Sequence, residues 1–321
     1  MTSPADHLST RFTAPRSPAQ TGRRMAKSPA QELMERETRF VFGRTPRTLK
    51  GFPLTPMSWQ MKGDSFLLRG VGEHYFHYQK GQGVTIERGP DVDPREEALW
   101  LNGSVYSAVA SMNGLLPIHA SAVAVGGAVV AFTGAAGAGK STLVAALASR
   151  GLPMFCDDTL ILDLSEPNRI VCLPGHKRLK LCPDAVELTG ATPQEKISGA
   201  LNKFYAQPAA GTVGVTLPLL SLVFLEEGPE AAITPIAGAE RFIRLQDDHQ
   251  TSRLFAEARS FDRADHFKHL ERLARQLHMA RFVRPRDPER FHEGIALAEQ
   301  YVVGLPADLH RSEDGRDQET D

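Results

Sequence analysis

The chain has 321 residues, with 37 Lys and Arg against 38 Asp and Glu and a formal net charge of −1. This balance provides no general basic field, so nucleic acid is not an expected partner. The three cysteines lack C-x-x-C spacing, which suits a reducing cytoplasm and offers no Cys and His cluster to a metal. No apolar run approaches the roughly 20 residues of a membrane span, so we expect a cytoplasmic protein without a membrane partner. The sequence leaves the oligomeric state open, a homo-oligomer included.

The first part of the chain predicts a leader followed by a small β-rich subdomain. Residues 1–31 are rich in Ser, Thr, Pro and Arg and have no apolar stretch, which favours a disordered leader. Within residues 32–92, strand-like runs at 65–69, 74–78 and 84–87 are separated by glycines. This pattern indicates a small subdomain or an antiparallel extension of a main sheet.

A helix is predicted over residues 94–116, near the start of a main domain that we expect to span 93–304. Asp93 is a candidate N-cap, Pro94 suits the first turn and Gly114 marks the end. Apolar residues at helical spacing can share one buried face: Leu99, Val105, Val109 and Met112.

Two apolar runs flank the glycines at 126–127, a strong signal for a two-residue β-hairpin. If these glycines form the turn, Val125 pairs with Ala128, and each position i pairs with 253 − i. His119 then lies opposite Gly134. A lone histidine is commonly structural, but this register makes His119 a candidate to tune a carboxylate or to contact phosphate.

The segment 134–141 matches the pattern G-x-x-x-x-G-K-[ST], and we call it the glycine loop. It follows an apolar strand-like run and precedes a helix-forming run over 141–150. Its glycines let successive N–H groups face phosphate oxygens, Lys140 reaches the terminal phosphates and Ser141 offers a hydroxyl to Mg²⁺. We therefore expect a nucleoside triphosphate and Mg²⁺. The expected contact residues are Gly134, Ala135, Ala136, Gly137, Ala138, Gly139, Lys140, Ser141 and Thr142.

Two adjacent carboxylates, Asp157 and Asp158, follow a predicted strand over 152–156. A strand–helix–strand crossover places the end of this strand at the same sheet edge as the glycine loop, where ligands of open α/β sheets bind. A turn or a helix cap is the alternative for such a pair. The position favours a functional role.

The segment 175–183 is the most basic short stretch of the main domain. If it is extended, Arg178 and Lys180 share one face while Leu179 and Leu181 pack on the other. The basic face could hold a phosphate of the nucleotide or of the product. The alternative is a solvated edge strand whose lysine discourages pairing with another strand.

The remaining elements carry no chemical signature of their own. Strands are predicted at 159–164, 169–173 and 219–225, amphipathic helices at 261–279 and 288–303, and an acidic solvated tail at 305–321.

The order of these features, from IHASAVAV through the glycine loop to FCDDTLIL, resembles the catalytic core of HPr kinase/phosphorylase and its stand-alone bacterial relatives, the HPr-kinase-like serine kinases. The resemblance covers residues 115–185 and continues more weakly into the last helices. It implies an α/β fold with a P-loop kinase core of the HPr-kinase type beside the β-rich N-terminal subdomain. It also implies ATP and Mg²⁺ as cofactors.

The resemblance also implies roles for single residues. Lys140 and the loop amides would bind the β- and γ-phosphates, and Ser141 would hold Mg²⁺. Asp157 would accept the proton of the attacking hydroxyl, Asp158 would help to hold the metal, and His119 would hydrogen-bond the base. The sequence itself does not separate the roles of the two aspartates.

Arg178 best matches the family's basic residue downstream of the aspartates. Thr142 stands where the bifunctional enzyme has an acidic residue, and no segment matches the one tied to its phosphorylase activity. Some relatives phosphorylate ribosomal peptides, including lasso-peptide precursors, so the resemblance implies a kinase that acts on a serine or other hydroxyl of a protein or peptide. Two alternatives stay open: an ATPase that remodels or delivers a partner peptide without phosphorylating it, and a nucleotide-binding scaffold.

Overall fold

The computed structural model describes residues 27–314 apart from 91, 94, 198–201, 247–256 and 259–262. Most of the predicted leader, residues 1–26, lies outside this part. Helix α1 (Pro29–Glu37) begins inside the last residues that we assigned to the leader. It begins there because Ser28 and Gln31 form a capping box, in which the Ser28 hydroxyl accepts from the Gln31 amide at 3.2 Å and the Gln31 side chain accepts from the Ser28 amide at 3.1 Å.

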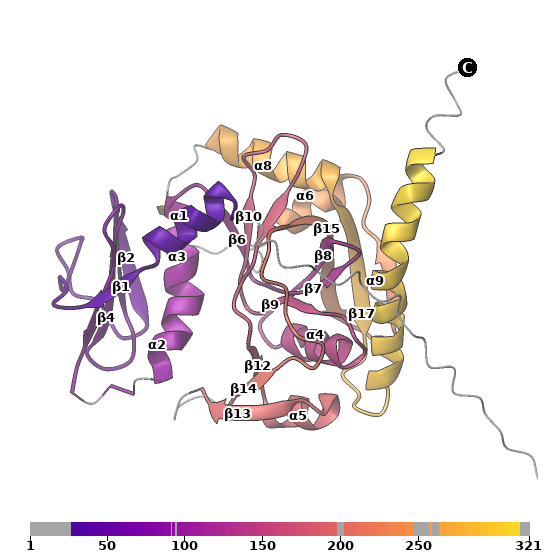
Figure 1. The fold of residues 1–321 in the computed structure, drawn as a ribbon, viewed down its shortest axis with the longest axis horizontal. Helices are drawn as coiled ribbons and strands as arrows, with labels where there is room; N and C mark the ends of the chain where they lie inside the picture. Colours follow the sequence, from indigo (N-terminus) through magenta and orange to yellow (C-terminus); the bar gives the residue numbers. More distant parts are fainter. Residues whose placement is uncertain are drawn as a thin grey trace, which may run out of the picture.

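The N-terminal part is built on a five-stranded sheet with the order β1-β5-β4-β3-β2 (Figure 1). Its strands are β1 (Phe40–Phe42), β2 (Ser58–Lys62), β3 (Ser65–Arg69), β4 (His74–Gln79) and β5 (Gly83–Arg88). β2 to β5 form an antiparallel meander, and β1 runs parallel to β5. The three predicted strands are confirmed, and they form a sheet of their own rather than an extension of the main sheet.

A helical segment connects this sheet to the rest of the molecule. It comprises α2 (Arg95–Trp100), a π-helical turn η1 (Leu101–Val105) and α3 (Tyr106–Met112). The predicted helix is confirmed over these residues but ends earlier than 116, because Gly114 adopts a left-handed φ of 81° and the chain turns into a strand. Val105 and Val109 pack in one cluster with residues of the five-stranded sheet and also with Ile161 and Leu173. The segment is thus a layer between the two sheets (Figure 1).

The main sheet has nine strands and is centred on the eleven-residue strand β15 (Leu217–Glu227). β15 runs parallel to β8 (Ala128–Thr133) on one side and to β17 (His278–Arg284) on the other. β7 (Ala120–Val125) lies beyond β8, and β9 (Met154–Cys156) beyond β7. The remaining strands are β6 (Leu116–Ile118), β10 (Leu160–Asp163), β11 (Val171–Leu173) and β16 (Ala232–Pro235).

Helices cover both faces of the main sheet. On one face, α4 (Lys140–Ser149) and α9 (Phe291–Asp314) pack on residues such as Val130 and Phe132. On the other face, α6 (Ala239–Leu245) and α8 (Arg263–Gln276) pack on residues such as Ala131. The described chain is therefore a mixed α/β protein with several sheets. None of its described helices combines the length and apolar character that a membrane crossing requires.

Two late predictions need correction. The helix predicted over 261–279 ends at Gln276, and the chain from His278 to Arg284 is strand β17, which was not predicted. α9 begins at Phe291 as the apolar spacing indicates, but it continues to Asp314, inside the segment predicted as a solvated tail; residues 315–321 lie outside the described residues.

A three-stranded antiparallel sheet and a short helix lie beside α4. The strands are β12 (Leu179–Leu181), β13 (Thr192–Lys196) and β14 (Phe204–Gln207), in the order β12-β14-β13, and the helix is α5 (Pro183–Thr189). Leu179 and Leu181 belong to the same hydrophobic cluster as residues of α4. β12 therefore attaches the small sheet to α4.

Candidate functional site

The hairpin register places His119 at the mouth of the glycine loop, as predicted. β7 and β8 pair from Val125 with Ala128 to Ala120 with Thr133. The turn glycines at 126–127 have φ values of 55° and 78°, which glycine adopts without steric cost. The Thr133 hydroxyl donates to the His119 carbonyl oxygen at 3.0 Å and fixes the end of the hairpin.

The glycine loop joins β8 to the N-terminus of α4, the strand–loop–helix arrangement that its motif requires. Gly139 is the N-cap residue, with a φ of 81°, and it has no side chain to satisfy the first N–H groups of the helix. These amides and the helix dipole favour an anion at this point. A side chain at Gly139 would also clash, because its Cβ would lie 2.5 Å from Nη2 of Arg284.

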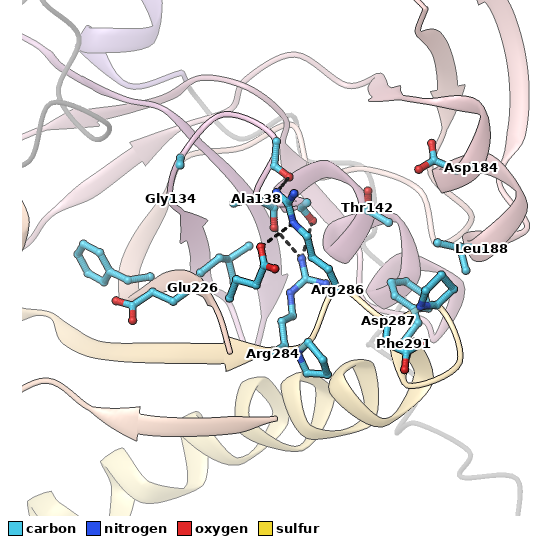
Figure 2. Close-up of a pocket in the computed structure, with 18 of the residues that line it drawn as sticks. Gly134, Ala138, Thr142, Asp184, Leu188, Glu226, Arg284, Arg286, Asp287 and Phe291 are labelled. Atoms are coloured by element: carbon cyan, nitrogen blue, oxygen red, sulfur yellow. Dashed lines mark hydrogen bonds and ion pairs between the residues drawn. The ribbon is translucent and has the colours of Figure 1, made fainter. Parts of the chain in front are cut away.

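A cleft of about 610 Å³ adjoins the glycine loop (Figure 2). Its walls come from the loop, from α5, from the end of β15 and from the chain that follows β17. Arg284 donates to the Ala138 carbonyl at 2.8 Å, and Arg286 donates to the Gly137 carbonyl at 2.9 Å. Figure 2 shows both arginines reaching the loop from the same side. They hold carbonyl groups of the loop from the side of the cleft.

Lys140 is a buried cation without a carboxylate partner among the described residues. Its side chain is 6% exposed and donates to the carbonyl oxygens of Gly134 at 2.9 Å and Ala135 at 3.0 Å. Burial lowers the pKa of Lys140, because the charged form is poorly solvated there. Such a group is energetically costly unless an anion joins it.

Asp157 is 1% exposed, and donors within the protein occupy both of its oxygens. Oδ1 accepts from the hydroxyls of Ser121 at 2.6 Å and Ser141 at 2.7 Å, and Oδ2 accepts from the Lys180 amide at 2.9 Å. β9 runs in the same direction as β8, since both pair antiparallel with β7. The predicted convergence of Ser141 and the aspartates at one sheet edge is therefore present.

Asp158 has a different environment although it is the next residue. Its φ of 72° is unusual for a non-glycine residue. Oδ2 accepts from Lys180 Nζ at 2.7 Å, Oδ1 lies 3.5 Å from Nδ1 of His119, and the side chain is 32% exposed. Burial alone would raise the pKa of Asp158, but the charge and hydrogen bond of Lys180 outweigh it and lower the pKa.

His119 contacts the aspartate turn through its ring. Nδ1 lies 2.8 Å from the Asp158 carbonyl oxygen, a contact in which the neutral ring donates from Nδ1. Burial lowers the pKa of His119, and the nearby ammonium of Lys140 lowers it further. The imidazole is therefore neutral at pH 7.

One oxygen of Ser141, at the start of α4, and one oxygen of Asp157 together suit a magnesium ion. Ser141 Oγ and Asp157 Oδ1 are hard oxygen donors only 2.7 Å apart, next to the helix N-terminus that would hold phosphate. In the described part of the chain, no group of three or more His, Cys, Asp or Glu side chains is arranged to hold a metal ion by itself. Mg²⁺ commonly uses one or two protein ligands and takes the others from phosphate and water, so the residues present fit this ion.

Arg178 and Lys180, predicted to share a basic face, lie in different surroundings. Lys180 is 8% exposed and pairs with Asp158, a contact that was not predicted. Arg178 stacks on the ring of Tyr205 at 3.9 Å and forms an ion pair with Glu195. Of these two residues, Lys180 is therefore the one that contacts the aspartate pair.

Lys177 bonds to the backbone of β9, and its burial leads to a testable pH effect. Its Nζ donates to the carbonyls of Phe155, at 2.6 Å, and Val213, and burial lowers its pKa from 10.5 to about 8. Between these two pH values the unfolded chain keeps the proton that the folded chain has lost. The free energy of unfolding therefore rises with pH, by up to about 1.4 kcal/mol per pH unit.

Denaturant unfolding of the wild type and Lys177→Met at pH 7, 8, 9 and 10 measures this contribution. The stability of the wild type relative to the variant should be constant below pH 8 and increase above it. A difference that stays the same across the whole range would show that Lys177 does not lose its proton on folding.

Comparison with known proteins assigns no family. The chain matches no protein-family model and no curated protein. Among solved structures, the HPr(Ser) kinase/phosphatase from Coxiella burnetii is similar to 64% of this chain and 99% of its own, with 14% identity and a TM-score of 0.36. A likeness of this size carries no argument, so a proposal for function rests on the geometry of the site.

Proposed function

We propose that this protein is an ATP-dependent kinase that transfers the γ-phosphoryl group to a hydroxyl of a protein or peptide. The observation that carries the proposal is the 2.7 Å contact between Ser141 and Asp157, because it joins the glycine loop to the aspartate pair. A loop for phosphates, a cation, a metal site and a carboxylate that can accept a proton are the parts that phosphoryl transfer needs. A serine of a ribosomal peptide precursor belongs to this substrate class.

In this proposal the glycine loop, Lys140 and the first amides of α4 bind the phosphates of ATP. Ser141 and Asp157 would hold Mg²⁺, which when bound neutralises negative charge on the phosphates. Arg284 and Arg286 keep the loop in its binding shape through their bonds to its carbonyls.

We propose Asp158 as the base, which exchanges the roles expected from the sequence resemblance. Asp157 is enclosed by three donors, whereas Asp158 is partly exposed and faces His119. The acceptor hydroxyl gives its proton to Asp158, its oxygen bonds to the γ-phosphorus, and the bond from that phosphorus to the β–γ bridging oxygen breaks to release ADP. A base of low pKa can act here, because the attacking hydroxyl becomes strongly acidic as its oxygen bonds to phosphorus, and the proton then passes to Asp158.

Incubation of the purified protein with [γ-³²P]ATP, Mg²⁺ and candidate precursor peptides tests the proposal. We expect label on a peptide hydroxyl, and its loss in Lys140→Ala. Release of inorganic phosphate without labelled peptide would favour the ATPase instead, and nucleotide binding without turnover would favour the scaffold. Undiminished labelling in Lys140→Ala would contradict the assigned site.

A further inference from the structure

Strand β1 forms one edge of the N-terminal sheet, and all three of its side chains are exposed. In the described part of the chain β1 pairs with β5 on one side, and no strand lies on its other side. Phe40, Val41 and Phe42 are 48%, 64% and 59% exposed, whereas Val84 and Ile86 of β5 are buried. An open edge of consecutive apolar residues is a template on which another strand can pair.

The backbone of β1 presents polar groups to this open edge. The Val84 amide donates to the Arg39 carbonyl at 2.8 Å, and the Gly43 amide donates to a carbonyl of β5 at 3.0 Å. Successive residues of a strand direct their N–H and C=O groups to opposite sides, so those of Phe40 and Phe42 face away from β5. Two donors and two acceptors are therefore in position to bond to an added strand.

A cavity of about 440 Å³ lies beside β1, between the sheet and the helical segment. Phe40 and Phe42 pair with the residues of β5 that pack on that segment, so they share the helix-facing side of the sheet. A strand added to β1 would direct alternate side chains to the same side, where apolar side chains suit the lining. The apolar lining residues are Phe40, Val84, Ala98, Leu101, Val105 and Tyr106.

The charges around the edge favour an acidic partner. Arg39 precedes β1 and Arg44 follows it after one glycine; both are exposed, and neither has a carboxylate partner within the described part of the chain. Glu97, which lines the cavity, is already paired with Arg88 at 2.5 Å. A second copy of the chain would bring like charges together at this edge. Residues 1–26, with four arginines and one aspartate, do not complement it either.

We propose that the open edge of β1 binds an extended acidic segment of a protein or peptide partner, which pairs with β1 as a further strand. Alternate apolar side chains of the segment enter the cavity, and carboxylates on either side of them lie near Arg39 and Arg44. In this mode of binding the backbone bonds supply affinity, and the cavity and the arginines select the sequence. The proposal concerns binding alone and does not depend on phosphoryl transfer.

The probe that tests this proposal is the peptide Asp-Glu-Ile-Thr-Val-Glu-Asp, labelled with fluorescein and amidated at its C-terminus. Fluorescence anisotropy with the full-length protein should show saturable binding that weakens as salt is added. Two control peptides separate the contributions: one has lysine at the four acidic positions, and the other has serine in place of Ile and Val. Both should bind at least about 10-fold more weakly than the acidic probe.

Phe42→Pro and Phe42→Val form a matched pair of protein variants. Both lose the aromatic ring, but only proline removes an N–H group from the open edge, and edge strands tolerate proline where the N–H faces solvent. The Kd of the probe should be about 10-fold higher for Phe42→Pro than for Phe42→Val. If Phe42→Pro fails to fold, the double variant Arg39→Glu and Arg44→Glu serves instead, and it should prefer the lysine peptide to the acidic one.

Several outcomes would overturn the proposal: no saturable binding to the wild type, equal binding of the acidic and lysine peptides, or equal Kd values for the two Phe42 variants. A wild-type dimer that sedimentation velocity detects and that Phe42→Pro abolishes would also overturn it, because a second copy would then occupy the edge. So would a synthetic peptide of residues 1–26 that displaces the probe at lower concentration than the unlabelled probe does.

Discussion

Replacement of Asp158 by Asn should lower the turnover number of phosphoryl transfer by about 10²–10⁴, the usual contribution of a positioned base. Asn cannot accept the proton of the acceptor hydroxyl, although it retains the size of Asp and can still accept a hydrogen bond from Lys180. The Kd for MgATP should change little, since the glycine loop and Asp157 are intact. Single-turnover labelling of a peptide acceptor, together with nucleotide titration, measures both quantities.

Asp157→Asn is the matched control, because it makes the same chemical change one residue away. Asp157 accepts bonds from two hydroxyls and one amide while almost fully buried. Its replacement should weaken the dependence on Mg²⁺ and lower the free energy of unfolding by about 1–3 kcal/mol, the cost of disturbed buried hydrogen bonds. If Asp157→Asn loses only the transfer step and Asp158→Asn retains it, the roles expected from the sequence resemblance would be restored.

The parts of the site that could be predicted from the sequence depend on local rules. The two-glycine turn fixes the register of β7 and β8, and that register alone puts His119 beside the glycine loop. The strand, loop and helix around Lys140 follow from apolar runs and glycine spacing. The direction of β9 follows from the crossover that α4 makes.

The parts that were missed depend on contacts between distant segments. Arg284 reaches the glycine loop because β17 pairs with β15, and the run HMARFVR was mistaken at its start for the end of a helix. The short run that contains Phe282 and Val283 and ends before Pro285 is the signal that could have revealed a strand. The contrast between the two aspartates was not accessible either, since it depends on the φ of Asp158 and on which lysine lies nearby.

Replacement of Lys140 should affect catalysis and stability in opposite directions, because its buried charge has no carboxylate partner among the described residues. Lys140→Met should lower the rate of phosphoryl transfer by about 10²–10³, the loss expected for one group that stabilises charge in a transition state. It should also weaken ATP binding. The free energy of unfolding should nevertheless rise, by about 1 kcal/mol, because a poorly solvated cation is replaced by an apolar side chain of similar length.

Lys177→Met is the control for this result. Lys177 is a second lysine whose ammonium donates to two carbonyls and whose pKa is lowered by burial, but it lies outside the cleft beside the glycine loop. Its replacement should leave the Kd for MgATP unchanged. Lys140→Met alone should combine a gain in stability with a loss of ATP binding. That result would mean that the buried charge of Lys140 serves to bind a phosphate ligand. Parallel losses of stability and ATP binding in Lys140→Met would instead mean that the lysine maintains the shape of the loop.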